Sequence, residues 1–169
     1  MAQGKFAEAC PKLQESQRLD PGSGTLLNLA VCFERQGRIA TAWTKFIEAM
    51  TTASAGNQLE RARFARELAS KLLPLVPKIV INVPAGEATA GLEVKRDGNL
   101  VGQPQWGVAV PVDPGEHQIT VSAPNRTPWE TKLIVKPNGQ SLTISVPVLA
   151  ALSGSAPPAS SPVPRRPPP

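Results

Sequence analysis

Residues 24–50, GTLLNLAVCFERQGRIATAWTKFIEAM, decide the fold of the N-terminal half of the chain. Large apolar and small residues recur here at intervals of three and four, which places them on one face of a helix on either side of Gly37. The stretch therefore predicts two amphipathic helices joined by a short turn. The side chains that share the apolar faces are Leu26, Leu29, Ala30, Phe33, Ala42, Phe46 and Ala49.

The same pattern occurs once more, earlier in the chain. The segment that begins at Gly4, GKFAEACPKLQESQRLDP, aligns with the segment that begins at Gly37 without a gap, and Leu13 falls on Phe46. Repetition at this period is typical of helical repeat arrays. Over about residues 1–53 the chain resembles tetratricopeptide repeats: the first segment is similar to a second helix with its closing Asp-Pro, and residues that follow are similar to a complete repeat.

The resemblance implies stacked helix pairs whose concave surface binds an extended peptide or a partner helix. Such arrays need about three repeats for an independently stable stack, and fewer than two are recognised here. A structural or docking element is therefore an equal alternative to a peptide-binding groove.

Both ends of the expected array are irregular. The first repeat lacks its first helix, and Pro11 lies inside the helix that remains, where it should bend it. One flank of Phe6 and Leu13 is thus expected to stay open, which makes these residues candidate contacts for a partner or for a weak homodimer through the N-terminal helix. A capping helix is expected over about residues 57–73, before Pro74. Its apolar stripe consists of Leu59, Ala62, Ala65, Leu68 or Ala69, and Leu72.

From Lys78 onward the apolar period changes from 3.6 to 2, which indicates strands with one buried face. Turn sequences such as Asp97-Gly98 and Pro137-Asn138-Gly139 separate the alternating runs. About six short strands follow, and they predict an antiparallel β-sandwich. The expected inward residues are Ile79, Ile81, Val83, Leu92, Val94, Val108, Val110, Val112, Ile119, Val121, Leu133, Val135, Leu142, Ile144 and Val146.

The order of these turns resembles the PEGA-type β-domain of bacterial envelope proteins, over about residues 78–149. Extra residues at 87–91 depart from the family pattern. The resemblance implies a small sandwich, and in similar proteins such a domain beside helical repeats belongs to the cell envelope. The matching segments are Val83-Pro84-Ala85-Gly86, Val94 to Gly98, Gly102 to Pro104, and Pro114-Gly115-Glu116-His117.

The chain is thus expected to be an α+β protein in two segregated modules with a tail. A tetratricopeptide-like array takes residues 1–76, a PEGA-like antiparallel sandwich residues 78–149, and a disordered proline-rich spacer residues 150–169. Pro164 to Pro167 have the form of a PxxP ligand, although such matches arise easily in proline-rich runs.

The net charge of +5 is spread thinly along the chain. Residues 1–77 carry ten Lys or Arg against seven Asp or Glu, and residues 78–152 carry six of each. A nucleic-acid binder concentrates basic residues on one face, so no nucleic-acid partner is expected. A signal-peptide pattern and a long apolar run are both missing from the sequence. This predicts a soluble chain, and a periplasmic or envelope location is implied only by the resemblance.

Few side chains are candidates for a functional site. Trp106 and Trp129 could stack on a sugar or a partner, but each keeps phase with buried aliphatic residues, which favours core packing. His117 shares the phase of Ile119 and has no second His or Cys to complete a metal site. A single histidine does not assemble a catalytic triad with any other pair of residues here. No catalytic residue, cofactor or metal is expected, and Trp106 is kept as a candidate partner contact.

Two short features near the first turn allow more than one interpretation. Cys10 and Cys32 fall on adjacent expected helices, where they are small buried hydrophobes, or a disulfide if the compartment is oxidising. The Gly22-Ser23-Gly24-Thr25 segment lacks the lysine and the strand of a phosphate loop, so its Ser or Thr is expected to cap the next helix.

These observations predict a non-enzymatic protein-protein interaction or scaffold protein, associated with the bacterial cell envelope. In this hypothesis the helices dock an unknown protein or peptide and the sandwich is a rigid spacer. The alternative is a carbohydrate- or cell-wall-binding sandwich with a helical stalk. A glycan array distinguishes the two hypotheses, and binding that is lost in Trp106→Ala while the fold survives would favour the second.

Overall fold

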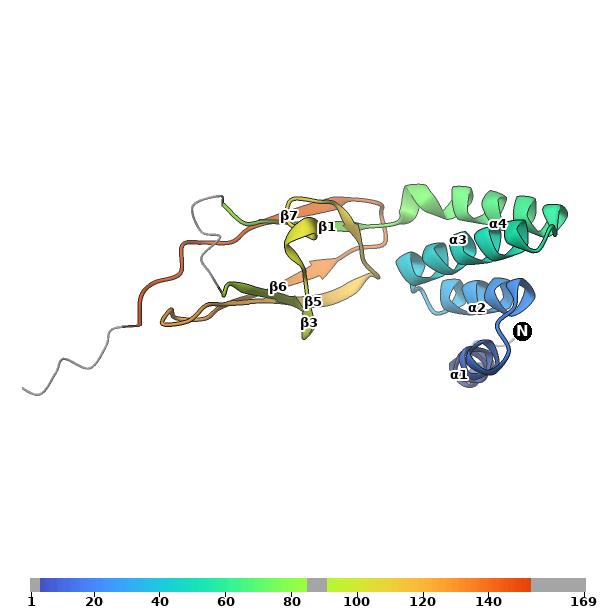
Figure 1. Cartoon of the computed structure of the whole chain (residues 1–169), viewed down its shortest axis with the longest axis horizontal. Coiled ribbons are helices and arrows are strands. Elements are labelled where there is room, and N and C mark those ends of the chain that lie inside the picture. The colour runs from blue at the N-terminus through green and yellow to red at the C-terminus, as the bar shows by residue number, and fades with distance from the viewer. Residues whose placement is uncertain (1–3, 85–90, 153–169) are drawn as a thin grey trace, which may run out of the picture.

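The computed structural model describes residues 4–84 and 91–152. Within them, four helices are followed by a β-rich region with two sheets, so the fold is α+β in two modules (Figure 1). We call residues 4–75 the helical module and residues 78–152 the β module. The extra residues of the first β loop and the proline-rich tail with its PxxP segment fall outside the described part, apart from Gly91 and the first residues of the tail.

The helical module is a row in which each helix packs against the next, and α2 also contacts α4. The turn between the second and third helices is made by Gly37, whose φ of 77° lies in the left-handed region that glycine adopts without strain. Phe33 and Phe46 from these two helices are almost fully buried, as the helical period predicts. The four helices are α1 (Gly4–Leu19), α2 (Ser23–Arg35), α3 (Ile39–Ala55) and α4 (Leu59–Leu72).

Two local expectations for the helices are wrong. Leu59 is 66% exposed because it is the first residue of α4, whereas Ala62, Ala65 and the later stripe positions are buried as expected. Ser23 does not cap α2: it lies inside the helix, and Gly22 occupies the N-cap position. The Ser23 hydroxyl instead donates to the side-chain oxygen of Gln58 at 2.6 Å, which ties α2 to the start of α4.

The β module contains two sheets that share one hydrophobic core (Figure 1). One sheet has the order β4-β1-β7 and the other β3-β2-β5-β6. Ile79 and Ile81 enter the core from the first sheet, and Val94, Ile119 and Val121 enter it from the second. The strands are β1 (Lys78–Asn82), β2 (Glu93–Arg96), β3 (Asn99–Leu100), β4 (Val110–Pro111), β5 (Gly115–Ser122), β6 (Trp129–Val135) and β7 (Ser141–Ser145).

Two strand predictions need correction. The sheets are not antiparallel throughout, because β1 and β7 pair in parallel, with Lys78 opposite Ser141. These strands are far apart in sequence, so no hairpin forces opposite directions. Val108 is 50% exposed rather than buried, since the backbone turns at Gly107, where φ is 72°. Of the three valines that were expected to point inward, Val112 is buried, Val110 in the short strand β4 is half-buried, and only Val108 is exposed.

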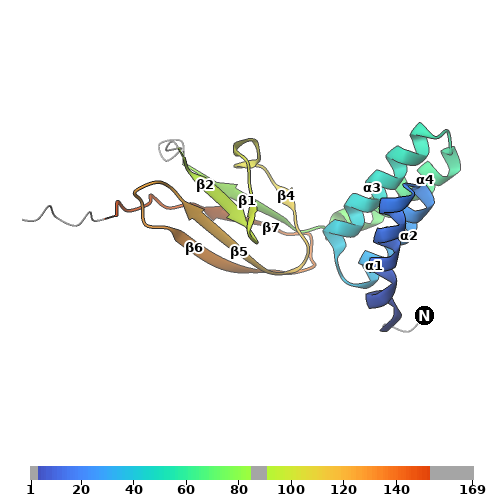
Figure 2. The same ribbon diagram turned by 60° about the horizontal axis from the view of Figure 1, so that its bottom comes forward.

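The two modules are joined by the short segment between α4 and β1 (Figure 2). A short 3-10 helix, η1 (Leu73–Leu75), follows α4, and the next two residues, Val76 and Pro77, are almost fully buried. The turn between β6 and β7 reaches back to this segment, where the Gly139 N–H donates to the carbonyl of Leu75 at 3.2 Å. The junction is therefore packed by residues of both modules.

Candidate functional site

A carboxylate of the β module caps a helix of the other module. The β4–β5 turn places Asp113 at the N-terminus of α3, where its Oδ1 accepts the backbone N–H of Thr41 at 2.8 Å. Its Oδ2 accepts the Thr41 hydroxyl at 2.5 Å and the Nε of Arg38 at 3.2 Å. The N-cap residue Arg38 cannot serve this role, because a guanidinium only donates. The negative charge of Asp113 also interacts favourably with the positive end of the helix dipole.

His117 contacts the backbone of the capping residue Asp113. Its Nε2 lies 2.7 Å from the backbone oxygen of Asp113, and its Nδ1 lies 2.6 Å from Oδ2 of Asp97. The ring is only 13% exposed. Asp97 is held in turn by the backbone N–H of Gln118, which donates to its Oδ1 at 2.9 Å. Asp97, His117 and Asp113 thus form a continuous hydrogen-bonded chain from the β2–β3 hairpin to α3.

The surroundings of Asp97 stabilise its ionised form. Burial by itself raises the pKa of this carboxyl, but the hydrogen bonds from His117 and from the Gln118 N–H outweigh that effect. The nearby positive charge of Arg96 acts in the same direction as these bonds. The net result is that the pKa of Asp97 lies below its ordinary value.

A pocket of about 300 Å³ opens between the modules beside these residues. It is lined by the cations Lys45 on α3 and Arg96 on β2 and by the carboxylates of Asp97 and Asp113, so its walls carry both signs of charge. The volume is at the lower end of what a small polar ligand needs. In the described ranges, the His, Cys, Asp and Glu residues form no group of three that could hold a metal ion.

The residues predicted as partner contacts lie elsewhere, and none of them lines this pocket. Phe6 and Leu13 on α1 are half-buried against the core of the helical module. Trp106 is half-buried against the core of the β module, and its Nε1 donates to the carbonyl of Val101 at 3.0 Å. Trp129 also packs on that core. Core packing of both tryptophans, which the strand phase favours, is confirmed.

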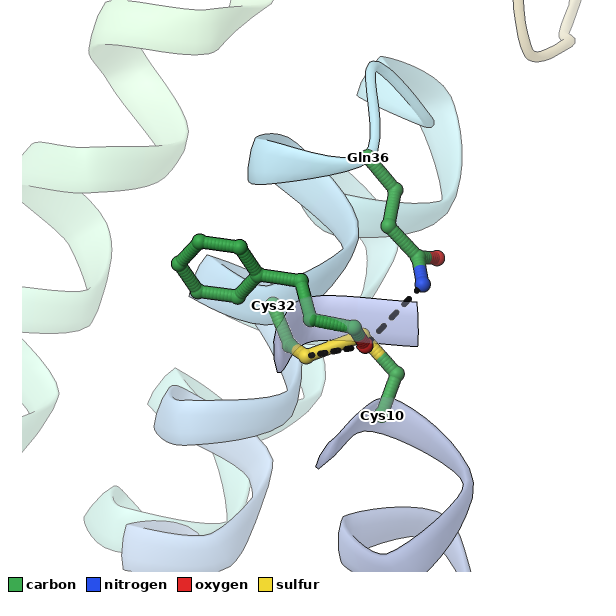
Figure 3. The surroundings of a disulfide bond; sticks show 4 residues. Cys10, Cys32 and Gln36 are labelled. Carbon is green, nitrogen blue, oxygen red and sulfur yellow. Dashed lines mark hydrogen bonds between the residues drawn. A yellow bond between two sulfur atoms is a disulfide. The ribbon is translucent and has the colours of Figure 1, made fainter. Parts of the chain in front are cut away.

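The two cysteines form a disulfide that joins α1 to α2 (Figure 3). Both are buried, and their Cα atoms are 5.7 Å apart. The Gln36 side chain donates to the carbonyl of Phe6 at 3.3 Å beside the bridge. The second dashed contact, 3.7 Å between the Cys32 sulfur and the same carbonyl, is van der Waals contact, because a disulfide sulfur has no hydrogen to donate. The sequence allowed either two free buried cysteines or a disulfide, and the structure contains the disulfide.

The outer side of α4 carries an exposed aromatic ring. Ala62, Ala65 and Ala69 are buried on the side of α4 that faces the preceding helices. Phe64 is 53% exposed. After α4 the described chain turns into η1 and the sheets rather than into another α-helix, so Phe64 has no covering element of that kind. Single exposed hydrophobic side chains are common on protein surfaces, so Phe64 is a candidate contact only because it lies on the uncovered side of the last helix of the row.

Comparison of the sequence with models of known protein families and with curated proteins finds no match. Among the helices that the structure describes, none combines the length and the apolar content needed to cross a membrane. The junction contacts of Asp97, Asp113 and His117 were not predicted from the sequence. The one available signal was that both aspartates begin turn sequences, Asp97-Gly98 and Asp113-Pro114-Gly115.

Proposed function

We propose that this chain is a non-enzymatic protein-protein interaction or scaffold protein, in which the helical module docks a partner and the β module supports it. The observation that carries the proposal is the exposed Phe64 on the outer side of α4, the last helix of the row. Aromatic residues, Phe among them, are enriched at the centres of protein-protein interfaces relative to the rest of the surface. The packed junction supports the second half of the proposal, because buried residues and a hydrogen bond join the two modules directly.

The finer description of both modules is part of the same proposal. A row of helices that each pack against the next supports a tetratricopeptide-like array, and two sheets around one core support a PEGA-like sandwich. The proposed PEGA-like sandwich includes one parallel strand pair, β1 with β7.

We also propose that the protein works in the bacterial periplasm or envelope. The support is the Cys10–Cys32 disulfide, because disulfides persist in oxidising compartments and are rare in the cytosol. Mass spectrometry of the alkylated protein from its source cells tests this part. Free thiols on Cys10 and Cys32 in freshly quenched cells would contradict it.

Photo-crosslinking from single positions tests the docking surface. A photoreactive amino acid at position 64 should give one defined adduct in the source cells. The matched control is position 100, because Leu100 is 65% exposed on the β module. Binding of the purified partner should then fall at least tenfold in Phe64→Ala, as it does for an anchor residue. Equal adducts at both positions, with the fold intact, would argue against docking on α4.

At the other end of the row, Phe6 and Leu13 remain proposed contacts for a partner or for a weak homodimer through α1. Light scattering across a dilution series detects such a dimer, and Leu13→Glu should abolish it. The carbohydrate-binding alternative has less support, since Trp106 already uses its N–H within the module and packs on the core. A glycan array with wild type and Trp106→Ala tests that alternative directly.

A further inference from the structure

Both ring nitrogens of His117, the single histidine of the chain, face oxygen atoms. A backbone carbonyl, here that of Asp113, can only accept a hydrogen bond, and so can the ionised carboxylate of Asp97. At 2.6 and 2.7 Å both contacts have hydrogen-bond length. The ring satisfies both acceptors only as the imidazolium, which donates from each nitrogen.

A neutral ring carries one N–H and can keep only one of these bonds. The bond to the Asp97 carboxylate is charge-assisted and therefore retains the hydrogen. The lone pair of Nε2 then faces the lone pairs of the Asp113 carbonyl, and two acceptors at this distance repel each other. Because Asp113 also caps α3, any displacement of its backbone pulls its carboxylate away from Thr41.

Charged groups around the ring come from both modules. Two carboxylates and three cations lie around it, while the residue opposite the ring on β6 is the apolar Leu133. These charged residues are Arg38 and Lys45 from the helical module, Arg96 and Asp97 from the β2–β3 hairpin, and Asp113 from the β4–β5 turn.

We propose that protonation of His117 holds the two modules together. The imidazolium bridges Asp97 to Asp113 and keeps the cap on α3 in place, and loss of its proton as the pH rises loosens the cap and lets the modules move independently. The proposal goes beyond the docking function and does not depend on which partner binds.

Nuclear magnetic resonance of the full chain, labelled with ¹⁵N and with the disulfide intact, tests this proposal. The His117 ring signals report its protonation from about pH 5 to 8.5, the range around an ordinary imidazole. The Thr41 amide reports the cap, and ¹⁵N relaxation gives a tumbling time for each module. We expect the three observables to share one midpoint. Hydrogen-exchange protection of Thr41 should fall about tenfold above it, the factor that one ordinary hydrogen bond contributes.

His117→Gln removes the only imidazole, so the Thr41 amide and the tumbling times should become independent of pH in this range. Asp97→Asn provides a second variant if the first folds poorly. An amide can accept from the imidazolium or donate to the neutral Nδ1, so Nε2–H can bond the Asp113 carbonyl in both states and the pH dependence of the Thr41 amide should shrink. The proposal is overturned if the His117 ring titrates while the Thr41 amide and the tumbling times stay constant. It is equally overturned if the pH dependence of Thr41 persists in His117→Gln.

Discussion

Gly139, at the turn between β6 and β7, lies against the backbone carbonyl of Pro74 at the end of the helical module. A Cβ atom added to Gly139 would overlap that oxygen, and the φ of this residue is 70°. The same glycine donates its N–H to Leu75. The junction therefore depends on the absence of a side chain at one position.

We expect Gly139→Ala to destabilise the protein more than a change of backbone conformation alone explains. The matched control is Gly98→Ala, because Gly98 has a φ of 78° and nothing within 4 Å of its added Cβ. The control should cost about 1 kcal/mol from the left-handed conformation, and Gly139→Ala about 1–3 kcal/mol more from overlap. Chemical denaturation measures both. Equal costs would show that the contact with Pro74 does not constrain the junction.

Removing the cap on α3 should weaken the attachment of the two modules to each other. Asp113→Ala leaves the Thr41 N–H without its acceptor, and loss of such a cap costs about 1–2 kcal/mol. Asp113→Asn keeps an oxygen acceptor and should lose less. Asp20→Ala, at an exposed turn residue, is the control and should be close to neutral. If Asp113→Ala lowers the unfolding free energy no more than Asp20→Ala does, the capping role is contradicted.

Reduction of the disulfide should release α1. The Cys10–Cys32 bridge spans 22 residues, and closing a loop of this size stabilises a protein by about 3 kcal/mol. Circular dichroism should record a loss of helix on reduction, and hydrogen exchange should localise it to α1. The variant Cys10→Ala/Cys32→Ala should resemble the reduced protein, and reductant should not change its helix content. If exchange in α1 stays unchanged on reduction, packing on α2 alone holds the helix.

Acid should remove the contribution of Asp97 to stability. Since the pKa of Asp97 is lower in the folded state than its ordinary value of about 3.9, the unfolded chain binds more protons in this range. The contribution is therefore present above about pH 4 and is lost as the pH falls through the folded-state pKa. The unfolding free energy of Asp97→Asn should decline less steeply than that of wild type between about pH 5 and 2. Parallel curves would contradict this prediction.

The sequence predicts the elements of this fold because each depends on a local period. Phe33, Phe46 and Ile79 are buried as their helical or alternating positions require. The turn at Asp97-Gly98 was predicted from its sequence, and both residues have the positive φ of a tight hairpin. Where the local pattern is interrupted by a turn, as at Gly107, the expected phase of Val108 is lost.

The contacts at the junction could not be predicted in this way. Asp113 and Thr41 are 72 residues apart and meet only because two separately patterned modules dock. Asp97 and His117 are 20 residues apart, on turns and strands whose register decides their meeting. Ser23 illustrates the same limit within one module: its chemistry suggests a local cap, but a nearby Gln58 gives its hydroxyl another partner.

The parallel ladder between β1 and β7 determines how the β module bears tension. β1 leaves the helical module directly, and β7 runs beside it in the same direction over five paired residues, from Lys78 opposite Ser141 to Asn82 opposite Ser145. A pull between the helices and the chain beyond Leu152 slides these two strands along each other and loads all the ladder's hydrogen bonds at once. Strands that peel apart lose such bonds one by one. The module is thus built to resist stretching along its long axis.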